Sequence, residues 1–215
     1  MTDTRLDGGD GLVIWPGRLD RCAQEALLEA IADAVRTAPF FIPRMPRTAK
    51  PFSVVMTNCG PLGWVADING YRYQKQHPDT GNLWPPIPAA LLALWEDLTG
   101  YAAPPEACLV NYYRPDARMS LHRDEDEDAL DAPILSVSLG DTALFRIGGR
   151  ERKGKTRSFR LASGDVLMLS GEMRHAYHGI DRLYPGTSTL LARHADLFPD
   201  GGRINLTLRR VAKVR

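Results

Sequence analysis

Apolar residues recur at helical spacing in two segments of the first half of the chain. The first segment starts at Asp20, whose side chain can cap a helix, and stops before Pro39. Its expected inward face carries Cys22, Ala26, Leu27, Ala30, Ile31, Ala34 and Val35. The second segment covers residues 89–99 and stops at Gly100; its inward residues are Leu91, Leu94, Trp95 and Leu98. We therefore expect two helices, each with one buried face.

After Pro105 the pattern changes to short apolar segments separated by turn-forming residues. Turns are expected at 140–141, 148–149 and 163–165, which are rich in glycine and aspartate. The expected strands are 108–113, 134–139, 144–147, 158–161, 166–169 and 203–211, with an earlier one near 53–56. Two helices followed by many short strands favour a mainly β fold, a sandwich or jelly roll with helices packed on one sheet.

The composition changes this picture little. Hydrophobic residues make up 44% of the 215 residues and charged residues 25%, which suits one ordinary globular domain. Residues 1–11 are polar and are expected to form a loose N-terminal arm, which leaves 12–215 as a single domain. The formal net charge of +1 does not mark the whole chain as a nucleic-acid binder, so local charge has to be considered.

Cysteine usage and hydropathy indicate the compartment. Cys22, Cys59 and Cys108 are far apart and form no CxxC pair, which argues against a disulfide framework or a zinc knuckle. No apolar run approaches the length of a membrane span, and the first residues hold no hydrophobic signal region. We therefore expect a cytoplasmic protein with no membrane partner. We also expect a monomer.

His122, Asp124 and His178 form a candidate metal site. Residues two apart in a strand share a face, so His122 and Asp124 are expected to point the same way and Arg123 the other way. His178 is expected to arrive from a later strand. Two imidazoles and one carboxylate suit Fe(II) and leave coordination positions open for substrates. An isolated HxD is common, however, and a lone histidine is more often a hydrogen-bonded core residue.

Residues 203–209 alternate strictly between polar and apolar side chains. The polar face carries Arg203, Asn205, Thr207 and Arg209. Such a strand can simply turn its polar face to water. Its two arginines also suit a small dicarboxylate, because the guanidinium fork matches carboxylate geometry.

Residues 108–113 repeat this pattern, with Asn111 and Tyr113 on one face. If both strands turn these faces toward the metal, 2-oxoglutarate is the expected ligand. Its keto-acid end can chelate iron while its far carboxylate meets an arginine.

Seven segments between residues 56 and 209 carry a resemblance to a known family. They are MTNCGPLGW at 56–64, YRY at 71–73, NYYRP at 111–115, LHRDED at 121–126, ILSVSLG at 134–140, YHG at 177–179 and RINLTLR at 203–209. Together they resemble the AlkB family of Fe(II)/2-oxoglutarate dioxygenases, in particular its bacterial DNA-repair members. The resemblance implies a double-stranded β-helix, or jelly roll, at about 105–211, with an N-terminal nucleotide-recognition lid at about 40–75.

The resemblance also implies roles for individual residues. The iron ligands would be His122, Asp124 and His178. The 2-oxoglutarate contacts would be Asn111, Tyr112, Tyr113, Arg203, Asn205, Thr207 and Arg209, with Arg203 at the distal carboxylate and Arg209 nearer the metal. The substrate contacts would be Trp64, Tyr71, Arg72, Tyr73, Asp126 and Arg152. Residues 44–52 differ in sequence from the family's lid, and Leu169 stands where an aromatic residue is expected.

The implied substrate fits two further features. A base methylated at adenine N1 or cytosine N3 is cationic and pairs poorly, so it is easier to flip out of a stack. Asp126, on the expected strand face of His122 and Asp124, can attract that cation and accept from an exocyclic amine. Trp64 and Tyr71 can stack on the flipped ring, although a single aromatic residue more often packs in a core.

Basic residues also cluster around one expected hairpin. They are Arg146, Arg150, Arg152, Lys153, Lys155, Arg157 and Arg160, with Glu151 as the single intervening acid. A charge run is usually a solvated face, but beside a nucleotide site these cations are better interpreted as phosphate contacts. Arg44, Arg47 and Lys50 would extend this patch.

The resemblance therefore implies oxidative demethylation of N-alkylated bases such as 1-methyladenine and 3-methylcytosine in DNA, with RNA as a second candidate. Fe(II), 2-oxoglutarate and O2 would be required, and formaldehyde, succinate and CO2 would be released. One alternative is a 2-oxoglutarate oxygenase that acts on a protein or a small molecule. Another is a non-catalytic nucleic-acid-binding module.

Overall fold

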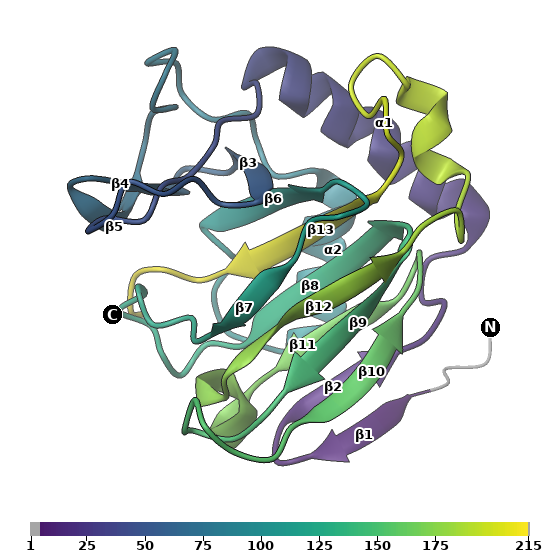
Figure 1. Cartoon of the computed structure of the whole chain (residues 1–215). Coiled ribbons are helices and arrows are strands. Elements are labelled where there is room, and N and C mark those ends of the chain that lie inside the picture. Colours follow the sequence, from purple (N-terminus) through teal and green to yellow (C-terminus); the bar gives the residue numbers. More distant parts are fainter. Residues whose placement is uncertain (1–4, 215) are drawn as a thin grey trace.

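The protein, a computed structural model that describes residues 5–214, consists mainly of antiparallel strands arranged in two facing sheets (Figure 1). The larger sheet has seven strands in the order β1-β2-β11-β8-β13-β6-β3. Their bounds are β1 Leu6–Gly9, β2 Leu12–Trp15, β3 Val54–Cys59, β6 Ala107–Tyr113, β8 Ile134–Gly140, β11 Val166–Leu169 and β13 Arg203–Arg209.

The smaller sheet has four strands in the order β10-β9-β12-β7. Their bounds are β7 Met119–His122, β9 Thr142–Ile147, β10 Arg157–Leu161 and β12 His178–Tyr184. A separate hairpin, β4 Gly63–Asp67 with β5 Gly70–Gln74, lies at the end of the molecule where β3 and β7 lie (Figure 1). The expected jelly roll is confirmed.

Two helices cover the outer face of the larger sheet, as the apolar pattern predicts. α1 spans Arg21–Thr37, and the Asp20 side chain caps it by accepting from the Ala23 N–H at 2.8 Å. α2 spans Ala89–Thr99 and ends at Gly100, which has the left-handed conformation. Two short 3-10 helices, η1 Gly171–His175 and η2 Leu190–His194, follow later in the chain. No helix among residues 5–214 has both the length and the apolarity to cross a bilayer.

Each face of the larger sheet packs into its own apolar core, which follows from the alternation of side chains along a strand. Val110 of β6 and Leu206 of β13 pack against the helices, together with Leu28 and Ile31 of α1. Leu109 and Ile134 face the smaller sheet, where they meet Phe145 and Ile180. These four residues also line the cavity of the candidate site.

The structure differs from the sequence predictions at the N-terminus and on α1. Residues 6–9, expected in a loose arm, form β1 and pair with β2, because Gly9, Asp10 and Gly11 all have positive φ and form a tight turn. Residues 1–4 lie outside the described part of the chain. On α1 the inward face is rotated, so Cys22, Ala26 and Ala30 are exposed while Leu28 and Ala32 are buried.

Candidate metal and co-substrate site

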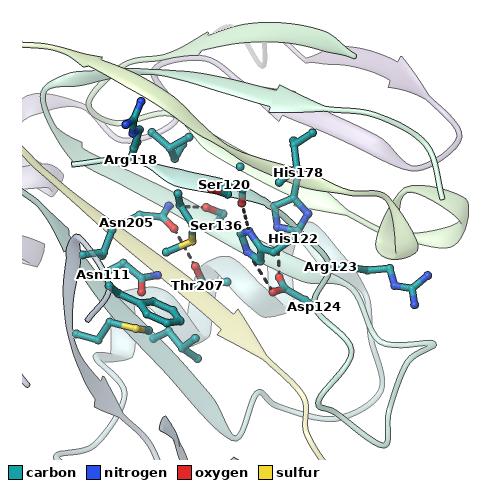
Figure 2. A pocket seen from close by; sticks show the side chains of 18 of the residues that line it. Asn111, Arg118, Ser120, His122, Arg123, Asp124, Ser136, His178, Asn205 and Thr207 are labelled. Atoms are coloured by element: carbon teal, nitrogen blue, oxygen red, sulfur yellow. Dashed lines mark hydrogen bonds and ion pairs between the residues drawn. The ribbon is translucent and has the colours of Figure 1, made fainter. Parts of the chain in front are cut away.

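Two neighbouring strands bring the two candidate histidine ligands together. His122 ends β7, His178 begins β12, and the two residues are direct partners in the antiparallel register. Asp124 lies two residues beyond β7, with Oδ1 3.6 Å from His122 Nε2 and Oδ2 3.4 Å from His178 Nε2. One possible ligand atom from each of the three residues lies within 4.8 Å of the others, so the predicted cluster can hold one metal ion (Figure 2).

Backbone carbonyls orient both imidazole rings. His122 Nδ1 lies 3.0 Å from the Ser120 carbonyl, and His178 Nδ1 lies 3.0 Å from the Ala176 carbonyl. Each carbonyl can only accept, so each Nδ1 carries the proton and each Nε2 keeps its lone pair for a metal. Burial, and the neighbouring charge of His178, lower the pKa of His122, which favours the neutral form that a metal requires.

Asp124 is held as a carboxylate in a buried position. Burial alone would raise its pKa, but Arg209 and the two histidines hold the pKa well below its ordinary value. The Arg209 Nη2 atom lies 2.8 Å from Asp124 Oδ1. A ligand that stays ionised and oriented in this way completes the two-histidine, one-carboxylate set that suits Fe(II).

The prediction that Asp124 and Asp126 share a strand face with His122 is wrong. β7 ends at His122, so Asp124 and Asp126 lie in the irregular segment that follows, and strand parity does not place them. The chain bends after His122, and Arg209 rather than a strand face positions the Asp124 carboxylate. Arg123 does point away from the metal cluster, toward Glu125 and the Tyr177 ring (Figure 2).

A cavity of about 730 Å³ opens between the two sheets at the metal cluster. The polar face of β13 lines it with Arg203, Asn205, Thr207 and Arg209, and β6 adds Asn111 and Tyr113. Asn205 donates to Ser136 Oγ at 2.6 Å and accepts from Thr207 at 2.9 Å, which fixes its amide (Figure 2). The polar faces of β6 and β13 thus line the same cavity as the metal cluster, which is the condition that the sequence set for 2-oxoglutarate binding.

Tyr112 is the exception among the predicted co-substrate contacts. It lies between Asn111 and Tyr113 on β6, so strand alternation sends its ring to the helix side of the sheet. There it packs against Phe40 and Phe198, and its hydroxyl donates to the Gly201 carbonyl at 3.0 Å. Tyr112 is therefore a core residue with no access to the cavity.

Arg203 is a fully buried cation without an acidic partner. Its guanidinium donates to the carbonyls of Asp141 and Leu161 and to Ser138 Oγ, and its Nε has no partner. Among residues 5–214, no carboxylate lies within ion-pair distance of it. Burial lowers the pKa of Arg203 to about 10. The cavity therefore suits an anion, and the donor set fits a dicarboxylate.

The predicted substrate residues divide into two groups. Trp64 and Tyr71 stack on each other at the cavity mouth, with ring centroids 5.5 Å apart, and Trp64 Nε1 donates to Asp126 at 2.8 Å. Arg152 also lines the cavity. Arg72 and Tyr73 do not: Arg72 pairs with Asp67 on its own hairpin, and the Tyr73 hydroxyl donates to Glu127.

The sequence pattern did not single out two residues that lie near the metal cluster. Glu127 and Arg174 are buried and paired at 2.9 Å behind Asp124. Neither lies in a periodic segment, so no spacing rule singles them out. Glu127 sits in an acidic run that normally indicates a solvated loop.

Comparison with known proteins agrees with this geometry. Residues 11–209 match the model of the 2OG-Fe(II) oxygenase superfamily. The chain is 55% identical over 202 residues to an alpha-ketoglutarate-dependent dioxygenase AlkB homolog of Caulobacter vibrioides, covering 93% of this chain and 87% of the relative. The chain belongs to the AlkB family. It is therefore an Fe(II)- and 2-oxoglutarate-dependent dioxygenase that uses O2.

Two further similarities support this membership of the AlkB family. The alpha-ketoglutarate-dependent dioxygenase AlkB of Escherichia coli is 40% identical over 195 residues, covering 89% of this chain and 86% of that protein. The solved structure of OsALKBH1 superposes with a TM-score of 0.81 at 28% identity, covering 96% of this chain and all of that one. Similarity in sequence and in fold therefore extends over most of the chain.

Removal of any one metal ligand is expected to abolish turnover. His122→Ala, Asp124→Ala and His178→Ala each remove one of three protein ligands, so both Fe(II) affinity and succinate formation should be lost. His175→Ala, outside the cluster, is the matched control and should keep both. Circular dichroism checks that each variant is folded. Near-normal succinate formation by any of the three variants would show that the cluster is not the metal site.

Truncation of Arg203 is expected to weaken 2-oxoglutarate binding strongly. Arg203→Ala leaves a carboxylate unpaired in a buried pocket, which typically costs about 2–5 kcal/mol. Arg203→Lys should recover only part of this loss, because a point charge cannot reproduce the guanidinium fork. Calorimetric titration of the metal-loaded variants with 2-oxoglutarate measures the effect. An unchanged affinity in Arg203→Ala would place the dicarboxylate elsewhere.

Proposed function

We propose that this dioxygenase removes methyl groups from N-alkylated nucleobases, such as 1-methyladenine and 3-methylcytosine, in DNA and with RNA as a second substrate class. The observation that carries the proposal is the arrangement at the cavity mouth. Two stacked aromatic rings, Trp64 and Tyr71, and one carboxylate, Asp126, line the same cavity as the metal cluster. A planar, cationic base fits two aromatic rings that can stack on it and a carboxylate that can pair with its charge.

Asp126 suits an alkylated base better than a neutral one. Burial raises the pKa of its carboxyl, while the hydrogen bond from Trp64 acts in the opposite direction. A cationic base beside this carboxylate would favour the charged form, and its exocyclic amine can donate to the free oxygen. Unmethylated bases carry no such positive charge, so the carboxylate of Asp126 favours the methylated bases.

The chain's own residues orient the reaction. His122, Asp124 and His178 would hold Fe(II), which together with 2-oxoglutarate and O2 supplies the oxidation of the methyl group. Arg203 would bind the distal carboxylate of 2-oxoglutarate, while Asn111, Tyr113, Asn205 and Thr207 line the walls around it. Oxidation of the N-methyl carbon to a hydroxymethyl group, followed by loss of formaldehyde, restores the base.

A second hollow supports nucleic acid as the partner. It has a volume of about 530 Å³ and adjoins the main cavity, since both are lined by Arg118 and Arg152. Arg146 and Lys153 also line it. Its lining holds these four cations against one acid, Asp181, and such a positive hollow suits a phosphodiester backbone.

Some cations of the β9–β10 hairpin are already paired within the protein and are therefore less free to bind phosphate. Arg146 pairs with Asp181, Arg150 pairs with Glu172, and Arg157 donates to the Gly8 carbonyl. Within the described part of the chain, Arg152, Lys153 and Lys155 take part in no ion pair. These three residues are therefore the best candidates for phosphate contacts.

We also expect a monomer in the cytoplasm. The three cysteines are free, with Cys59 and Cys108 buried, which suits a reducing compartment. The alternatives, an oxygenase of proteins or small molecules and a non-catalytic binding module, do not account for the aromatic pair and the cationic hollow together with a complete metal cluster.

The decisive test is mass spectrometry of a methylated oligonucleotide incubated with the protein, Fe(II), 2-oxoglutarate and ascorbate. We expect the loss of one CH2 unit of mass for each methyl group, with formaldehyde and succinate formed in equal amounts. A matched reaction with Asp124→Ala controls for background oxidation. Succinate formation without any mass loss from 1-methyladenine or 3-methylcytosine oligonucleotides would contradict the proposal.

Neutralising Arg152, Lys153 and Lys155 together, each to Gln, should weaken oligonucleotide binding. The slope of log affinity against log salt should fall by about one unit for each lost phosphate contact. The matched control is the same charge change at Arg18, Arg21 and Arg36 near α1, each of which has an acidic partner. Equal affinities and slopes for both triple variants would place the nucleic-acid path elsewhere, along residues 44–50.

A further inference from the structure

Four ionisable side chains form a buried cluster behind the metal site. Asp124, Glu127, Arg174 and Arg209 have side chains that are at most 8% exposed, and each acid pairs with at least one of the two arginines. Two negative and two positive charges balance. We call these four residues the charge cluster. Its member among the candidate metal ligands is Asp124. Arg209 also lines the cavity, whereas Glu127 and Arg174 do not.

Arg174 ties the backbone of the metal ligand to another part of the chain. Its Nη1 donates to the Asp124 carbonyl at 2.6 Å, its Nε donates to the Ala132 carbonyl at 3.0 Å, and its Nη2 donates to Glu127 at 2.9 Å. Asp124 and Ala132 both belong to the irregular segment between β7 and β8. Arg174 belongs to η1, just before His178. One guanidinium therefore fixes the segment of one metal ligand against the segment of another.

Glu127 extends the charge cluster to the β4–β5 hairpin. One of its oxygens accepts from Arg209 Nη1 at 2.7 Å and from the Tyr73 hydroxyl. Arg209 in turn lies 2.8 Å from Asp124. Tyr73 belongs to β5, the strand that also carries Tyr71 at the cavity mouth. A continuous path of hydrogen bonds thus runs from the hairpin through Glu127 and Arg209 to the metal ligand.

We propose that Tyr73, Glu127 and Arg174 are positioning residues that hold Asp124 and Arg209 in the geometry that the metal and 2-oxoglutarate require. Through Tyr73, the hairpin that carries the substrate-stacking aromatic becomes part of the same unit. The proposal rests on the proposed role of Asp124 as an iron ligand. It also changes the role of Tyr73, which the sequence suggested as a substrate contact.

The surroundings of Tyr73 favour this role over substrate contact. The Tyr73 hydroxyl donates to a carboxylate that is fully buried, and it does not line the cavity. Burial raises the pKa of Tyr73, so the hydroxyl keeps the proton that it donates. Glu127 has no solvent to replace a lost donor, and a carboxylate that shifts toward Arg174 takes Arg209 with it.

Two mild substitutions test the proposal. Tyr73→Phe removes one hydroxyl, and Glu127→Gln removes one charge with little change of shape. Residues that orient metal ligands typically contribute about 10- to 100-fold to metal affinity. We expect a loss in this range for Glu127→Gln and of about 10-fold for Tyr73→Phe. The matched control is Asp128→Asn, the same change of carboxylate to amide at the exposed neighbour of Glu127.

The readout is binding in the absence of nucleic acid. Calorimetry measures the affinity of each protein for Mn²⁺, and then the affinity of the Mn²⁺-loaded protein for 2-oxoglutarate, well below the melting temperature. Both affinities should fall in Tyr73→Phe and Glu127→Gln and stay at the wild-type value in Asp128→Asn. A purely structural role would lower only the melting temperature. If Glu127→Gln does not fold, Tyr73→Phe alone decides.

Three other outcomes would overturn the proposal in distinguishable ways. If Tyr73→Phe changes only the KM for the methylated oligonucleotide, Tyr73 is a substrate contact. If both variants bind Mn²⁺ and 2-oxoglutarate as the wild type does, the charge cluster serves stability alone. If the wild type itself binds neither ligand, the assignment of the metal site fails, and the positioning role fails with it.

Discussion

The direct pairing of His122 with His178 is the constraint on which the site depends. Antiparallel strands place paired residues at a fixed separation, and this pair occurs where β7 ends and β12 begins. The two imidazoles therefore converge at the mouth of the sandwich rather than within its core. Backbone carbonyls fix which nitrogen of each ring faces the shared space. A single carboxylate, brought in by the following segment, completes the metal cluster.

The two faces of the larger sheet have different roles, one in packing and one in lining the cavity. Its outer face carries apolar residues that the helices cover, and these form a core apart from the cavity. Its inner face carries the polar side chains of β6 and β13, which would be costly to bury without partners. Most of them find partners in one another, in Ser136 or in acids of the charge cluster. The polar surface that remains is the surface available to ligands.

Both helices and most strands of the two facing sheets were predictable from the sequence. Strands β1 and β2, the β4–β5 hairpin and the contacts of most irregular segments were not. The period-two pattern of β13 identified all four of its cavity residues, and the same rule excludes Tyr112 once it is applied to β6. Asp124 and Asp126 were assigned by strand parity although they lie in a loop, where the fold places them through Arg209 and Trp64. The partners of Tyr73 come from distant segments, so no local pattern reveals them. The turn at 9–11 did carry a signal, since glycine-rich sequences permit the positive φ angles that β1 requires.

The buried, unpaired guanidinium of Arg203 has a consequence for the lifetime of the protein. A cation without a counter-ion in a core lowers the stability of the fold that contains it. If the proposed dicarboxylate binds at Arg203, it would supply the missing charge to the folded state alone, and its stabilisation of the fold would rise with the logarithm of its concentration. Bound 2-oxoglutarate would thus complete the charge balance of the buried core. Starvation for 2-oxoglutarate would then reduce the amount of enzyme as well as its rate, because the unliganded chain unfolds and is degraded sooner.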